Sequence, residues 1–133
     1  MSGVLVISHG AIGETLLASA EQILGARQAQ VATLGVSRGD DPDQVLARAR
    51  GFAAQLDSGA GVLVLTDMFG ATPCNVASRL LADGRIEGVS GVSLPMLVRV
   101  LSGRNGSLPA AVQRALTGGA EGVVHMNTDS CGG

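Results

Sequence analysis

The feature that most constrains the fold of this chain is a regular alternation of short apolar runs with segments of helical spacing. Four runs rich in valine, isoleucine and leucine predict strands at residues 4–7, 31–36, 62–65 and 89–92. The run at 62–65 is apolar on both faces, which is typical of a buried parallel strand. Repetition of strand and helix predicts an α/β fold, a parallel sheet with helices on both faces. We expect a flavodoxin-like open sheet with strand order 2-1-3-4.

Between the strands, apolar residues recur with the period of a helix. The first helical stripe stops at Gly25, and Asp40 is the predicted cap of the second helix. Thr72 is the predicted cap of the third helix, with Pro73 at its first position and Leu81 as its last residue.

The last third of the chain predicts two more helices and a short strand. The first of these helices covers residues 96–101, and the second starts at Ser107 and ends before Gly118 and Gly119. Residues 123–126 predict the final strand. We therefore expect one domain over residues 1–126 and a loose polar tail over residues 127–133.

Composition excludes several classes of protein. The formal net charge is −2, and the chain has neither tryptophan nor tyrosine, so a nucleic-acid-binding surface is not expected. All nine basic residues are arginine, which excludes Schiff-base chemistry and a Walker A lysine. No apolar run approaches the roughly 20 residues of a membrane span, and no secretory signal is visible. We expect a cytoplasmic protein without a disulfide framework.

Two chemically active residues follow directly after the first and third predicted strands. They are His9 and Asp67. Open parallel sheets bind ligands beyond the carboxyl ends of their strands, where the strand order reverses, and here that point lies between strands 1 and 3. Neighbouring strands are about 4.8 Å apart, so the imidazole and the carboxylate can touch. The carboxylate would fix the ring tautomer and leave the other ring nitrogen as a nucleophile for phosphoryl transfer.

The segment after Asp67 can bind an anion. Residues 69–73 lead into a predicted helix N-terminus, where backbone N–H groups and the helix dipole favour a phosphoryl group. We expect Gly70, Ala71 and Thr72 to contact that group. The sequence contains no carboxylate cluster suited to Mg²⁺, so neither a metal nor another cofactor is predicted.

Three segments resemble the enzyme IIA (EIIA) domains of the mannose family of the sugar phosphotransferase system (PTS). They are Val4–Gly10 (VLVISHG), Thr66–Ala77 (TDMFGATPCNVA) and Gly91–Leu97 (GVSLPML). The resemblance extends in order and spacing from about Gly3 to Met126, which makes it specific. Two positions depart from the family pattern: residues 37–40 replace a common Pro-Gly turn, and Phe69 replaces a common tryptophan.

The resemblance implies a phosphocarrier. His9 would take a phosphoryl group on Nε2 from the phosphohistidine of HPr and pass it to an enzyme IIB (EIIB) domain or protein. Asp67 would orient His9, and the loop to Thr72 would contact the phosphoryl group. The family is also dimeric, with residues 123–126 exchanged between subunits as an antiparallel edge strand. A role in sugar uptake and a purely regulatory role both stay open.

Three other classes fit parts of the pattern. A response-regulator receiver would be phosphorylated on Asp67 itself, but it needs an acidic pair after the first strand and a lysine. A metal-dependent hydrolase would use His9, Asp67 and His125, yet a dense ligand set is lacking. A non-catalytic binding module would keep the fold with a vestigial site. Structural roles are the expected ones for His125 and Cys74.

Overall fold

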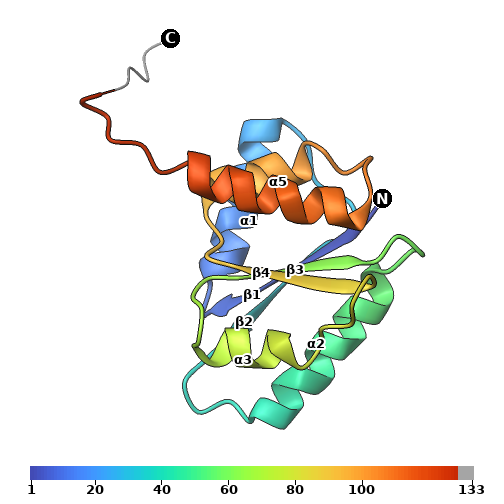
Figure 1. Ribbon diagram of the computed structural model, residues 1–133. Coiled ribbons are helices and arrows are strands. Elements are labelled where there is room, and N and C mark those ends of the chain that lie inside the picture. Colours follow the sequence, from blue (N-terminus) through green and yellow to red (C-terminus); the bar gives the residue numbers. More distant parts are fainter. Residues whose placement is uncertain (129–133) are drawn as a thin grey trace.

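The computed structural model, which describes residues 1–128, contains a four-stranded parallel sheet with the predicted order β2-β1-β3-β4 (Figure 1). The strands are β1 (Gly3–His9), β2 (Val31–Val36), β3 (Val62–Thr66) and β4 (Ile86–Ser90). Helices α1 (Ile12–Leu24), α4 (Leu94–Leu101) and α5 (Leu108–Glu121) cover one face of the sheet. Helices α2 (Pro42–Leu56) and α3 (Thr72–Ser78) cover the other face.

The alternation of side chains along β1 divides the core into two layers. Val4 and Val6 pack toward α1, α4 and α5, whereas Leu5 and Ile7 pack toward α2 and α3. All four side chains are fully buried. Successive residues of a strand point to opposite faces, so a strand that is covered on both faces needs the uninterrupted apolar run that the sequence has.

A buried arginine holds the amino end of the sheet, opposite the carboxyl ends of the strands. The guanidinium of Arg104 donates to the backbone carbonyls of Ser2 (2.8 Å), Gln30 (3.0 Å) and Ala29. Burial lowers the pKa of Arg104 from its ordinary value, because desolvation disfavours the charged form. The hydrogen bonds connect the loop after α4 to the start of β1 and β2.

Two predicted helix caps were wrong by one residue. The cap of α2 is Asp41, whose carboxylate accepts from the Asp43 N–H, while Asp40 instead accepts from the N–H of Ser37 at 2.7 Å. Ala71 is the cap of α3, and Thr72 lies inside the first turn. The third helix also ends at Ser78, three residues earlier than predicted.

Two predicted boundaries near glycines were also wrong. Strand β4 begins three residues before the predicted segment and ends two residues before its end, because Gly91, with φ of 90°, turns the chain out of the sheet. Helix α5 continues through Gly118 and Gly119. A Cβ at Gly118 would lie 3.0 Å from the Arg99 Cβ and 3.3 Å from the Met96 Cα, so this glycine permits close packing of α5 on α4 and does not stop the helix.

The predicted final strand does not form within the described part of the chain. Residues 123–125 lie outside any helix or strand, and residues 126–128 form a turn closed by the Thr128 N–H on the His125 carbonyl at 3.0 Å. Of the predicted tail, residues 129–133 lie outside the described residues. Among residues 1–128, none of the helices has the length and apolar character needed to cross a bilayer.

Candidate active site

The carboxyl ends of β1 and β3 place the two predicted residues side by side. His9 is the last residue of β1 and is aligned with Val36 of β2. Ile7 is aligned with Thr66, the last residue of β3, so Asp67 begins the next loop beside the end of β1. By the alternation of the strand, His9 shares the sheet face of Ile7, which α2 and α3 cover. The predicted switch point between strands 1 and 3 is therefore where these residues lie.

One carboxylate oxygen of Asp67 holds both the main chain and the ring of His9. Asp67 Oδ2 lies 2.8 Å from His9 Nδ1 and accepts from the His9 backbone N–H at 3.0 Å. An ionised carboxylate can only accept hydrogen bonds, so the ring nitrogen that faces it carries the hydrogen. The Asp67 side chain is 10% exposed and the His9 side chain 48% exposed. In the neutral ring, Nε2 is then the nitrogen with the free lone pair.

The environment of Asp67 favours its charged form. Burial raises the pKa of Asp67, but the hydrogen bonds from the backbone and ring of His9, with smaller contributions from its own N–H and the charge on His9, outweigh burial. The pKa of Asp67 is therefore lowered from its ordinary value of 3.8. The carboxylate is ionised at neutral pH and can stabilise positive charge on the ring.

Three residues that the sequence reasoning missed shape the turn after His9. Gly10 has φ of 48° and donates its N–H to the Val36 carbonyl at 2.9 Å. The carbonyl oxygen of Gly10 packs against Gly35, where a Cβ atom would lie only 2.3 Å from that oxygen. Ser8 is 1% exposed and accepts from the Gly13 N–H at 2.8 Å. The serine directly before His9 was visible in the sequence, whereas the contact of Gly35 depends on the strand register.

The predicted phosphoryl-binding segment covers the end of the loop after Asp67 and the first residue of α3. Gly70 and Thr72 are exposed and Ala71 is half-buried. Gly70 has φ of 84°, which favours glycine. No side chain caps the N-terminus of α3. Backbone N–H groups at the start of a helix that lack a side-chain cap can bind water or an anion.

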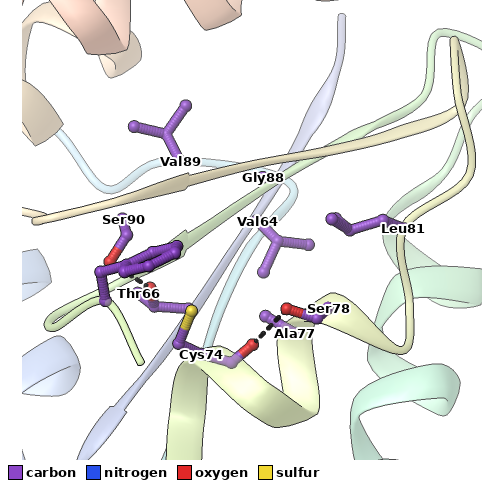
Figure 2. Close-up of a pocket in the computed structure, with 10 residues that line it drawn as sticks. Val64, Thr66, Cys74, Ala77, Ser78, Leu81, Gly88, Val89 and Ser90 are labelled. Atoms are coloured by element: carbon purple, nitrogen blue, oxygen red, sulfur yellow. Dashed lines mark hydrogen bonds between the residues drawn. The ribbon is translucent and has the colours of Figure 1, made fainter. Parts of the chain in front are cut away.

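A small pocket of about 120 Å³ lies between α3 and the neighbouring strands β3 and β4 (Figure 2). The Cys74 thiol and the hydroxyls of Thr66 and Ser90 point into it, and Thr66 donates to Ser90 at 3.1 Å. Phe69, which is 84% exposed, also lines the pocket. Neither His9 nor Asp67 lines this pocket, and the His9 ring is half-exposed at the end of β1.

The remaining candidate groups lie apart from the His9–Asp67 pair. His125 is exposed in the segment after α5, and Cys74 is buried at the start of α3. Within residues 1–128, no three His, Cys, Asp or Glu side chains gather as a set of metal ligands.

Comparisons with known proteins agree on one family. A family model described as the PTS system fructose IIA component matches residues 3–116. The mannose-specific EIIAB component of Escherichia coli strain K12 is 35% identical over 123 residues, which are 90% of this chain and 38% of that protein. The fructose-specific EIIA component of Bacillus subtilis strain 168 is 30% identical over 103 residues, 77% of this chain and 70% of that protein.

A solved structure extends the similarity to the whole fold. The EIIA component from Streptococcus agalactiae superposes with a TM-score of 0.85 at 28% identity, and the match covers 97% of this chain and 100% of that one. This chain thus matches the full length of one relative and 38% of the length of the E. coli relative.

Proposed function

This chain belongs to the mannose-type EIIA family of the PTS, a family of phosphocarriers, and on that premise we propose that His9 is its phosphoryl acceptor. The donor is the phosphohistidine of HPr, and the acceptor in the second step is an EIIB domain or protein. The observation that carries this proposal is the 2.8 Å contact between His9 Nδ1 and Asp67 Oδ2. It favours the tautomer with hydrogen on Nδ1, in which the Nε2 lone pair is available in a half-exposed ring.

Bond making and breaking in the transfer step involve the two imidazoles and the phosphoryl group. The Nε2 lone pair attacks phosphorus and forms a new N–P bond, while the N–P bond of the donor breaks and its electron pair returns to the donor ring. The Nδ1 hydrogen stays on His9 and remains hydrogen-bonded to Asp67. The carboxylate stabilises the positive charge that develops on the ring. Transfer to EIIB repeats the step with the roles reversed.

The loop before α3 supplies donors to the phosphoryl oxygens in this proposal. Backbone N–H groups of Gly70, Ala71 and Thr72, and the Thr72 hydroxyl, are the expected contacts. The positive φ of Gly70 and the absence of a side-chain cap at the start of α3 support this assignment. Phosphoryl transfer depends mainly on positioning and on stabilising charge at the equatorial oxygens.

The receiver alternative has weaker support. Phosphorylation of Asp67 would require a free and accessible carboxylate oxygen. Asp67 Oδ2 already accepts two hydrogen bonds from His9, and the whole side chain is 10% exposed. The acceptor nitrogen of His9 is the more accessible nucleophile.

The test is phosphorylation by phosphoenolpyruvate, enzyme I and HPr, followed by intact mass under non-acidic conditions. We expect one acid-labile phosphoryl group per chain, which His9→Ala abolishes. His125→Ala is the matched control because it removes the other histidine, and it should be phosphorylated as the wild type is. An acid-stable label, or a label that persists in His9→Ala, would overturn the assignment.

We also propose that the protein is a homodimer in which residues 123–126 pair with β4 of a second copy. Strand β4 is one of the two edge strands of the sheet, and Val123 and Met126 are 85% and 69% exposed. An open strand edge and exposed apolar residues each favour pairing with another chain. Light scattering after size exclusion at micromolar concentration should give twice the chain mass. A monomer under these conditions would contradict the strand exchange.

A further inference from the structure

A buried hydroxyl lies one residue before the proposed phosphoryl acceptor. Ser8 is 1% exposed, and its Oγ accepts from the backbone N–H of Gly13 at 2.8 Å. The same hydroxyl donates to the His9 carbonyl at 3.3 Å. The cap residue of α1, Ala11, makes no side-chain hydrogen bond. Ser8 therefore supplies the missing cap from outside the helix and joins it to the main chain of His9.

The turn between His9 and α1 is held on its other side by β2. The Gly10 N–H donates to the Val36 carbonyl at 2.9 Å. Gly35 has no Cβ, and this leaves room for the Gly10 carbonyl oxygen. The main chain that carries the imidazole thus has one anchor in β2 and another through Ser8 in α1.

The side chains of Ser8 and His9 point to opposite faces of the sheet. Ser8 faces α1, as its bond to Gly13 shows, and His9 shares the face of α2 and α3. The Ser8 hydroxyl is therefore separated from the reacting nitrogen by the sheet. Any influence on phosphoryl transfer must pass through the backbone of His9.

A shift of the His9 backbone would affect phosphoryl transfer because Asp67 Oδ2 contacts both the backbone N–H and the ring of His9. It accepts from the backbone N–H at 3.0 Å and lies 2.8 Å from Nδ1. A displacement of the His9 main chain changes both distances together. Ring orientation, tautomer and main-chain position are coupled at one oxygen atom.

We propose that Ser8 is a positioning residue for phosphoryl transfer: its hydroxyl holds the His9 main chain where the ring stays on Asp67. This inference rests on the proposed function of His9. Removing the hydroxyl leaves the buried Gly13 N–H without its acceptor and frees the turn to move. Misplacement of a reacting group by about 1 Å can slow a reaction by about 100-fold, so we expect Ser8→Ala to lower the rate of phosphorylation about tenfold or more.

The experiment compares three variants. Ser8→Ala removes the hydroxyl, Ser8→Thr keeps it, and Ser2→Ala removes a serine that is equally buried, at 1% exposure, at the other end of the sheet. The first readout is the rate of phosphorylation by phospho-HPr per folded molecule. The second is the tautomer of His9 from ¹⁵N chemical shifts of the imidazole nitrogens in the unphosphorylated protein, which needs no phosphoryl donor.

We expect Ser8→Ala to slow phosphorylation about tenfold and to reduce the fraction of His9 that carries hydrogen on Nδ1. The phosphorylation rates of Ser8→Thr and Ser2→Ala should stay within threefold of the wild-type rate. A rate within threefold and an unchanged tautomer in Ser8→Ala would overturn the proposal. Loss of folding in Ser8→Ala would also overturn it, because the hydroxyl would then serve stability alone. Absence of phosphorylation in the wild type would refute the proposed function, while the tautomer measurement would still decide the role of Ser8.

Discussion

Replacing Asp67 with asparagine is the sharpest test of the charge beside His9. The substitution keeps the shape of the side chain and an oxygen that can accept from the His9 backbone N–H, but it removes the negative charge. Hydrogen bonds to charged groups stabilise by about 1.5–3 kcal/mol, against about 0.5–1.5 kcal/mol for neutral ones. The expected loss is the difference, about 1–2 kcal/mol, and it acts where the ring becomes positive, in the transition state.

That loss corresponds to a rate that is about 5- to 30-fold lower, since about 1.36 kcal/mol is a factor of ten. Asp67 is shielded from water, with 10% of its side chain exposed, so salt should reduce the effect little. The assay is rapid-quench phosphorylation by phospho-HPr. Asp43→Asn is the matched control, because Asp43 pairs with Arg79 at 3.6 Å and is 86% exposed. A rate for Asp67→Asn within twofold of wild type would refute the electrostatic reasoning.

Three further predictions concern stability. The pKa of Asp67 is lowered in the folded state, so its contribution to stability is complete above the ordinary value of 3.8 and is lost as pH falls through the folded-state pKa. Below about pH 4, the free energy of unfolding measured with urea should therefore fall less steeply with decreasing pH in Asp67→Asn than in the wild type. Arg104→Ala leaves three backbone carbonyls without their donor and should lower the free energy of unfolding by about 3 kcal/mol, with a loss under 1 kcal/mol contradicting the role. Gly51 lies in α2 with open space around it, so Gly51→Ala should raise the free energy of unfolding by about 0.5–1 kcal/mol. At Gly118 a new methyl group would meet α4, so Gly118→Ala should lower the free energy of unfolding by about 1 kcal/mol. Equal effects at both sites would contradict the role of Gly118 in packing.

The helix caps show where local sequence signals fail. Aspartate and threonine are good caps wherever they stand, so Asp40 and Thr72 were plausible on residue type alone. In the folded chain Asp40 instead closes the turn with Ser37, and the extended conformation of Ala71 starts α3. A preference shared by neighbouring residues cannot choose between them, because the geometry of the incoming loop decides.

The glycine pair in α5 shows a second kind of failure. Gly118 and Gly119 predicted the end of the helix because glycine is a common stop. In the folded protein these glycines let α5 pack closely on α4, because a side chain at Gly118 would meet Arg99 and Met96. Helix–helix contacts are set by tertiary packing, which a local pattern does not contain.

The amino-acid sequence by itself determined the parallel α/β architecture and the two residues of the pair, because the periods of apolar residues and the positions of His9 and Asp67 after strands are local properties. Only the tertiary structure decided that one oxygen of Asp67 holds both the backbone and the ring of His9, and that Ser8 and Gly35 shape the turn beside them. The physical reason is separation along the chain. His9 and Asp67 are 58 residues apart, and the distance between such residues depends on strand register and loop closure, which arise when the whole domain packs.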